Sequence, residues 1–172
     1  NLVELMGGHL SVESRPGEGT VFSVEIPFLL HKGASEEQEE MGEDFCCRGK
    51  RILLAEDNEI AADVLKDILK AMGAEVDWAC NGKAAVEMFG NMALLYDLIL
   101  MDVQMPQVDG YEATRQIRST SPAGEQIPII ALTGNAFKED IKASKQAGMN
   151  HHISKPVKKK ELEKVLRKLL TN

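Results

Sequence analysis

The 172-residue chain lacks several features that would assign it to particular protein classes. No apolar run approaches the ~20 consecutive residues that a membrane-spanning helix needs, and no secretory signal peptide is present. Its three cysteines, Cys46, Cys47 and Cys80, have no metal-ligand spacing. An odd number of cysteines without a signal peptide is typical of a reducing compartment. We therefore expect a cytosolic chain without membrane contact of its own, although a longer parent protein can be membrane-anchored.

The chain also lacks a basic excess. The formal net charge is -7, and residues 1–49 account for all of it, with three Lys or Arg against ten Asp or Glu. Residues 50–172 carry seventeen residues of each sign. Nucleic-acid binding depends on a basic surface, so we expect no nucleic-acid partner.

From Lys50 onward, the sequence alternates short apolar runs with helical periods. The runs predict strands near residues 51–55, 75–79, 97–101, 127–132 and 150–153, and the periods predict helices near residues 59–72, 82–92, 110–118, 136–147 and 158–170. Five βα repeats favour a parallel sheet with helices on both faces, because parallel neighbours need crossover connections. We therefore expect an α/β fold with a doubly wound, five-stranded parallel sheet.

The residues before Lys50 have a different character. Residues 1–28 predict the end of a helix followed by a β-hairpin, with strands at 9–14 and 20–27. Residues 31–49 hold six acids and show no apolar periodicity, which is typical of a solvated linker. One hairpin and a helix end cannot build a stable core, so we expect a remnant of a larger domain. The predicted organisation is a remnant at 1–30, a linker at 31–49 and a compact domain at 50–172.

Acidic, hydroxyl and basic residues stand at the C-terminal ends of four predicted strands. Glu56 and Asp57 follow the first strand, Asp102 closes the third, Thr133 follows the fourth and Lys155 follows the fifth. Open α/β sheets place their active sites at this rim. The three acids repel one another and favour an oxygen-preferring cation, for which Mg²⁺ is well suited. Such a cation offsets the repulsion between a carboxylate and a phosphoryl group, so the set predicts phosphoryl transfer.

Four motifs, in order and at compatible spacings, carry a family resemblance. They are LLAEDN at 53–58, LILMDVQMPQVDGYEATRQIR at 98–118, PIIALTGNAFKED at 128–140 and AGMNHHISKPV at 147–157. Residues 50–172 resemble the receiver domain of two-component response regulators, in the variety found at the C-terminus of hybrid sensor histidine kinases. The first 28 residues resemble the last helix and terminal hairpin of a histidine kinase ATP-binding domain. The resemblance implies a flavodoxin-like receiver fold with strand order 2-1-3-4-5.

The resemblance also implies a role for each site residue. Asp102 would be the nucleophile that forms an acyl phosphate. Thr133 and Lys155 would stabilise the phosphoryl oxygens, and the bond between Lys155 and Pro156 would be cis. The implied magnesium site consists of Asp57, Asp102 and the backbone carbonyl of Gln104, with Glu56 acting through water.

The implied partner is a phosphohistidine, either of a kinase dimerisation domain or of a histidine phosphotransfer domain. None of the Asn-rich and Gly-rich nucleotide-binding boxes of histidine kinases is found in the chain, so we expect an acceptor rather than a kinase. The switch residues would be Thr133 and His152. His152 stands three residues before Lys155, where stand-alone receivers often have Tyr or Phe, so we expect a weaker switch.

Two alternatives stay open from the sequence. A small Mg²⁺-dependent phosphatase of the aspartyl-phosphate type also uses an Asp at a strand end. That chemistry usually needs a second Asp two residues later, where this sequence has Gln104. A receiver-like domain that only docks or inhibits would need no phosphoacceptor, and the intact set of Asp102, Thr133 and Lys155 argues against it.

Overall fold

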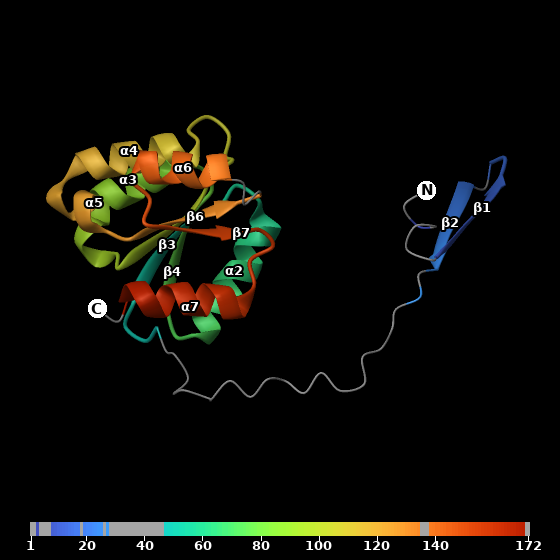
Figure 1. Ribbon diagram of the computed structural model, residues 1–172, viewed down its shortest axis with the longest axis horizontal. Coiled ribbons are helices and arrows are strands. Elements are labelled where there is room, and N and C mark those ends of the chain that lie inside the picture. Colours follow the sequence, from blue (N-terminus) through green and yellow to red (C-terminus); the bar gives the residue numbers. More distant parts are fainter. Residues whose placement is uncertain are drawn as a thin grey trace. The chain divides into compact units, whose positions relative to one another are not determined.

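The chain divides into two compact units, residues 1–41 and residues 42–172 (Figure 1). The computed structural model describes residues 3, 8–17, 19–25, 27, 47–134 and 138–170. The first unit contains an antiparallel hairpin of β1 (His9–Arg15) and β2 (Gly19–Glu25). The predicted hairpin is therefore present. The helix end expected before it, apart from residue 3, and residues 31–46 of the expected linker lie outside the described residues.

The second unit is built on a five-stranded parallel sheet. Its strands are β3 (Arg51–Ala55), β4 (Glu75–Ala79), β5 (Leu98–Asp102), β6 (Ile129–Thr133) and β7 (His151–Ser154). Their spatial order is β4-β3-β5-β6-β7, which is 2-1-3-4-5 in chain order and confirms the predicted fold class and strand order. Every residue of β5 and β6 is buried, because helices cover both faces of these central strands.

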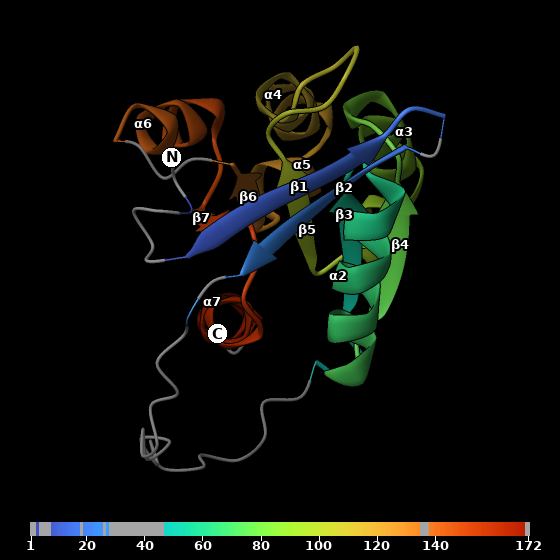
Figure 2. The same ribbon diagram turned by 90° about the vertical axis from the view of Figure 1, so that its right-hand side faces the viewer.

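Helices cover the sheet in two layers, which Figures 1 and 2 show from two directions. α2 (Glu59–Ala71) and α7 (Lys159–Leu170) pack on one face through a shared apolar cluster. α3 (Gly82–Met92) and α4 (Gly110–Thr120) pack on the other. α6 (Lys138–Ala147) lies between β6 and β7 in the chain. Among the described residues, no helix is long and apolar enough to span a bilayer.

Short elements and element ends differ from the predictions. The 3-10 helix η1 (Ala93–Leu95) and α5 (Pro122–Gln126) were not predicted, because segments this short show no helical period. β6 begins at Ile129 rather than at residue 127, because Pro128 has no N–H to donate to a sheet. β5 begins and ends one residue later than predicted, so that Asp102 is its last residue.

Two local features place helices beside the acidic residues. The side chain of Asn58, the N-cap of α2, accepts a hydrogen bond from the backbone N–H of Ala61 at 3.0 Å, so the helix begins two residues after Asp57. α4 begins at Gly110, next to the end of β5. A Cβ at this position would clash with the carbonyl oxygen of Asp102, so the approach requires glycine.

Candidate functional site

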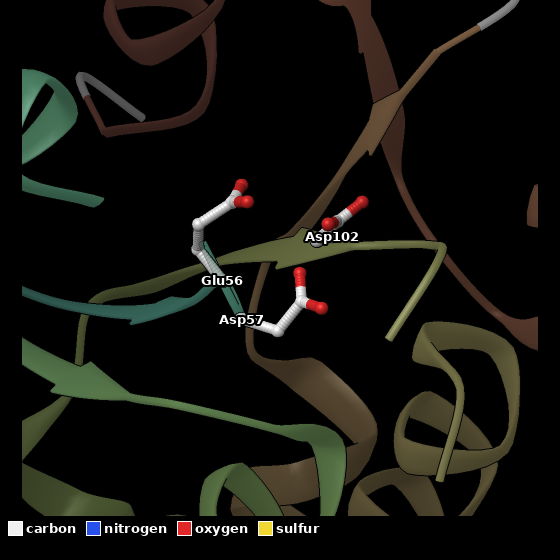
Figure 3. Close-up of side chains that lie close together, drawn as sticks. All are labelled: Glu56, Asp57 and Asp102. Atoms are coloured by element: carbon white, nitrogen blue, oxygen red, sulfur yellow. The ribbon is translucent and has the colours of Figure 1, made fainter. Parts of the chain in front are cut away.

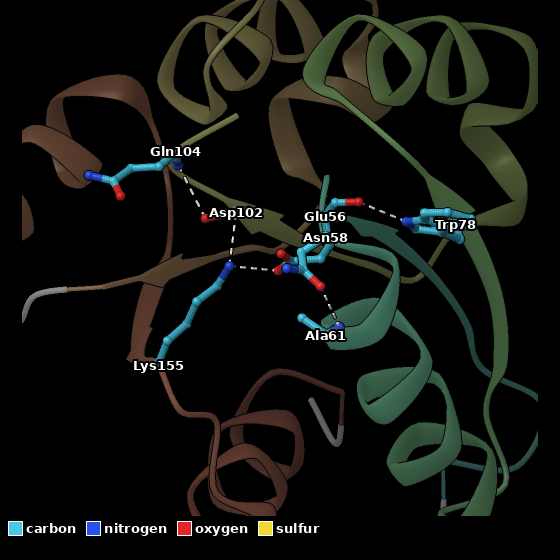
Figure 4. Close-up of polar contacts among 7 residues, drawn as sticks. All are labelled: Glu56, Asn58, Ala61, Trp78, Asp102, Gln104 and Lys155. Atoms are coloured by element: carbon cyan, nitrogen blue, oxygen red, sulfur yellow. Dashed lines mark hydrogen bonds and ion pairs between the residues drawn. The ribbon is translucent and has the colours of Figure 1, made fainter. Parts of the chain in front are cut away.

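The structure brings four of the predicted residues together at the carboxyl rim of the sheet. Glu56, Asp57 and Asp102 each place a carboxylate oxygen within 4.8 Å of the other two (Figure 3). Glu56 and Asp102 are 1% and 4% exposed, whereas Asp57 is exposed. The ammonium of Lys155 donates to Glu56 Oε2 at 2.7 Å and to Asp102 Oδ2 at 2.8 Å (Figure 4). One cation therefore pairs with two of the three acids, and an excess of negative charge stays at the rim.

Burial and ion pairing shift the pKa in opposite directions for each partner of the contact between Lys155 and Glu56. Burial raises the pKa of the Glu56 carboxyl above its ordinary value, and the hydrogen bond from Lys155 opposes this only in part. Burial by itself lowers the pKa of the Lys155 ammonium. The hydrogen bonds to Asp102 and Glu56 outweigh that effect, so the pKa of Lys155 is raised. Lys155 is therefore held charged, while ionised Glu56 would gain from another cation.

The three acids fit a magnesium site. Carboxylate oxygens are the ligands that Mg²⁺ prefers, and oxygens from three residues lie within 4.8 Å of one another. Lys155 leaves part of their charge unbalanced. Glu56, Asp57 and Asp102 are the residues that would hold the ion. Its chemical contribution would be to neutralise charge between a carboxylate and an incoming phosphoryl group.

Gln104 contacts the site through its main chain. Its backbone N–H donates to Asp102 Oδ1 at 3.1 Å, while Lys155 takes the other oxygen of the same carboxylate (Figure 4). Both oxygens of Asp102 are thus oriented. The sequence prediction concerned the carbonyl of Gln104 as a metal ligand and did not include this N–H. A backbone donor in a tight loop after a strand leaves no side-chain signal in the sequence.

Thr133 and His152 lie on the two neighbouring strands β6 and β7. Thr133 ends β6, is 5% exposed, and is paired in register with Ser154, the residue before Lys155. His152 is half-buried on β7, and its ring stacks on that of His151 with the ring centroids 5.7 Å apart. Residues 135–137 of the loop after Thr133 lie outside the described residues.

The peptide bond between Lys155 and Pro156 is cis, as the resemblance implied. This pair joins β7 to the segment that leads into α7. Lys155 and Pro156 also border an apolar groove of about 400 Å³ that runs along α2. Ile60 and Val64, one helical turn apart, contribute to this groove with 77% and 55% of their surfaces exposed. The groove therefore ends at the acidic site, because Glu56 also lines it.

Sequence comparison identifies related proteins for most of the chain. The response regulator receiver domain family matches residues 52–167. The autoinducer 2 sensor kinase/phosphatase LuxQ of Vibrio vulnificus (strain YJ016) is 39% identical over 166 residues, which is 94% of this chain and 19% of that relative. A match of this extent includes most of the residues before Lys50. The chain spans about a fifth of the length of this curated relative.

Solved structures give the same result. The receiver domain of sensor histidine kinase PA1611 from Pseudomonas aeruginosa PAO1, with a magnesium ion in its active site cleft, is 40% identical with a TM-score of 0.67, over 72% of this chain and 99% of that chain. The receiver domain of the histidine kinase CKI1 from Arabidopsis thaliana, complexed with Mg²⁺ and BeF₃⁻, is 35% identical with a TM-score of 0.67, over 75% and 95%. The chain belongs to the response regulator receiver domain family, and its homologues are receiver regions of hybrid sensor histidine kinases.

Proposed function

We propose that Asp102 accepts a phosphoryl group from a phosphohistidine in a Mg²⁺-dependent reaction, and then relays the group or switches the conformation of the domain. The observation that carries the proposal is the buried carboxylate of Asp102, hydrogen-bonded to Lys155 and grouped with Glu56 and Asp57. Receiver domains of hybrid kinases accept phosphate from histidine-containing partners, which supports this assignment.

In the proposed step, a carboxylate oxygen of Asp102 attacks the phosphorus of the phosphohistidine. A P–O bond forms while the P–N bond breaks, and the electron pair of that bond returns to the imidazole nitrogen, which takes up a proton. The product is an acyl phosphate. The ammonium of Lys155, 2.8 Å from Asp102 Oδ2, and the hydroxyl of Thr133 stabilise the phosphoryl oxygens in this proposal.

The apolar groove along α2 is suited to bind a helix of the partner protein. Amphipathic helices bind by laying their apolar face into such a groove. Ile60 and Val64 offer exposed apolar surface there, and Glu56 and Lys155 stand at the same groove. A helix in this position would present its histidine to Asp102. The proposed occupant is therefore the phosphohistidine-bearing helix of a kinase dimerisation domain or of a histidine phosphotransfer domain.

The two alternative functions have less support. A phosphatase of the aspartyl-phosphate type would need an acid at position 104, and the amide of Gln104 does not titrate near neutral pH. A domain that only docks would gain nothing from two buried acids that share one lysine, because burying charge is costly. The arrangement around Asp102 therefore favours the acceptor function.

We further propose that Thr133 and His152 transmit the phosphorylation. Movement of Thr133 toward the new phosphoryl oxygens would shift the end of β6 against β7, where Thr133 and Ser154 are paired. His152 would then take up space that Thr133 vacates. Because imidazole is smaller and more polar than the ring of Tyr or Phe, the two states should be weakly coupled. Beryllofluoride tests the switch: amide NMR shifts confined to residues 103–109, with none at 151–154, would refute it.

The acceptor assignment is tested by intact-protein mass spectrometry after incubation with acetyl phosphate and Mg²⁺. We expect one added phosphoryl group, none in Asp102→Asn, and none when EDTA is present. Labelling of the Asp102→Asn protein, or full labelling of the wild-type protein in EDTA, would exclude Asp102 or the metal from the reaction.

The groove assignment needs a second experiment, with a phosphorylated histidine phosphotransfer domain as the donor. Val64→Glu should slow labelling from this donor at least about tenfold and leave labelling from acetyl phosphate unchanged, because only the protein donor uses the groove. Leu94→Glu is the matched control, since Leu94 is 91% exposed on η1, outside the groove. Equal rates for the two variants would remove the groove from the proposal.

A further inference from the structure

One aromatic side chain outside the acidic group binds the main chain of the site. Trp78, the only tryptophan of the sequence, lies on β4. Its indole N–H donates to the carbonyl oxygen of Glu56 at 2.8 Å (Figure 4). The backbone N–H of Glu56 donates to the carbonyl of Ala79, the next residue of β4, at 3.1 Å. Strand β4 therefore holds the main chain of Glu56 on both sides of its Cα.

The carbonyl that Trp78 binds belongs to the peptide group between Glu56 and Asp57. A peptide group is planar, so fixing its oxygen also fixes the direction in which the chain continues to the Cα of Asp57. Among the described residues, none makes a hydrogen bond or ion pair with the carboxylate of Asp57. The direction of this carboxylate therefore depends on the main chain that carries it.

The indole of Trp78 is itself held in place. Its ring packs against the apolar cluster between the sheet and α2. The ammonium of Lys66 on α2 lies 4.9 Å from the ring centroid and pairs with Asp63 at 2.6 Å. The donor that reaches Glu56 thus has a defined position in the metal-free protein.

We propose that Trp78 is a positioning residue for the magnesium site. Its indole N–H sets the peptide plane between Glu56 and Asp57, and so prearranges the acidic pair for the cation. The hydrogen bond of Trp78 goes to the main-chain carbonyl of Glu56 and not to an acidic side chain. The inference rests on the proposed metal role of Glu56 and Asp57, and it adds a residue on a different strand to that site.

The decisive variant removes the N–H and keeps the ring. Because the chain has one tryptophan, 3-benzothienylalanine supplied to a tryptophan auxotroph replaces Trp78 alone, with sulfur in place of the N–H. We expect the Kd for Mg²⁺, measured by calorimetry on the full chain, to rise roughly five- to tenfold, as for the loss of one hydrogen bond. The rate of labelling by acetyl phosphate at saturating Mg²⁺ should change less than about twofold. Trp78→Phe should show the same split between affinity and rate.

Two matched variants separate this inference from the function on which it rests. Lys66→Met removes the cation above the ring but keeps the indole N–H and the apolar packing that positions it, so its Mg²⁺ affinity should stay within about twofold of that of the wild-type protein. Asp57→Asn should lose most of its Mg²⁺ affinity, and failure to do so would overturn the proposed metal site. If Asp57→Asn loses affinity while both Trp78 variants bind Mg²⁺ as tightly as the wild-type protein, the role of Trp78 is refuted and the proposed function stands.

Discussion

Three acids gather toward each end of the parallel sheet, but only toward the amino rim does every one of them have a cationic partner, and in this sense we call that rim balanced. At the amino rim, Asp97 accepts a hydrogen bond from the ammonium of Lys50 at 2.9 Å and another from the backbone N–H of Arg51 at 2.8 Å. The guanidinium of Arg51 binds Asp77 at 2.7 Å and lies 3.5 Å from Glu75. The side chains of these acids are 25% to 72% exposed. Charge at this rim is paired and partly solvated.

At the carboxyl rim, the buried acids Glu56 and Asp102 share the single ammonium of Lys155, while the exposed Asp57 has no ion-pair partner among the described residues. Buried charge without full compensation lowers the stability of a fold. The same strand, β3, begins with Arg51 at the balanced rim and leads into Glu56 at the unbalanced one. The comparison indicates that charges at the amino rim fix the strands, whereas those at the carboxyl rim are kept for a cation and a phosphoryl group.

The largest expected effect comes from comparing one substitution at each rim. Asp57→Asn should weaken Mg²⁺ binding at least about 100-fold, because loss of a direct ligand should cost no less than loss of an outer-shell contact. Labelling by acetyl phosphate at low Mg²⁺ should fall in parallel. Asp97→Asn at the amino rim should leave both quantities within about twofold of wild type. Calorimetry and mass spectrometry measure them, and equal losses in both variants would contradict the division between the rims.

The second prediction concerns stability at the balanced rim. Arg51→Met should lower the free energy of unfolding, because Asp77 loses charged hydrogen bonds of 2.7 Å and 3.3 Å. The hydrogen bond from Arg51 is the main reason why the pKa of Asp77 lies below its ordinary value of 3.8. The ion pair between Arg51 and Asp77 stabilises the fold above pH 3.8. This contribution is lost as the pH falls through the pKa of Asp77 in the folded state, which lies below 3.8. Urea denaturation should show this deficit, with labelling of Asp102 unchanged.

Much of this arrangement could be predicted from the sequence. The apolar runs predicted all five strands of the sheet, and the C-terminal ends of those runs indicated the site residues that the structure brings together. The contact between Trp78 and Glu56 could not be predicted, because it joins residues on different strands and ends on a backbone atom. The sharing of Lys155 by two buried acids likewise depends on tertiary packing. The cytosolic location and the absence of nucleic-acid and membrane partners stay predictions.

A third change tests whether Lys155 acts on the bound phosphoryl group. Lys155→Ala should keep the fold and should not weaken Mg²⁺ binding, because the ammonium competes with the cation for the same acids. Beryllofluoride should then cause less than about half of the wild-type amide NMR shifts across residues 151–154. Lys158→Ala is the control, since Lys158 is exposed and makes no contact with the acids. Wild-type shifts in Lys155→Ala would show that the switch does not use this lysine.

The smallest expected effect is a gain in stability, whereas the other substitutions weaken binding, stability or the switch. Glu56→Gln should raise the free energy of unfolding of the metal-free protein by about 1 kcal/mol near pH 7.5, a size common for single substitutions. Burial raises the pKa of Glu56 despite the hydrogen bond from Lys155, so the folded state disfavours the ionised form. The neutral amide removes that penalty, and Lys155 keeps its contact with Asp102.

The pH dependence of Glu56→Gln distinguishes this cause from a general packing effect. A carboxyl with a raised folded-state pKa destabilises the protein above that pKa, and the penalty disappears once the pH falls below the ordinary value of 4.5, where both states are protonated. The gain from glutamine should therefore be complete near neutral pH and absent below pH 4.5. Saturating Mg²⁺ should reverse the ranking, because the ion stabilises the wild-type carboxylate more than the amide. Urea denaturation at three pH values, with and without Mg²⁺, measures both effects, and a gain that persists in acid would mean that the charge of Glu56 is not its origin.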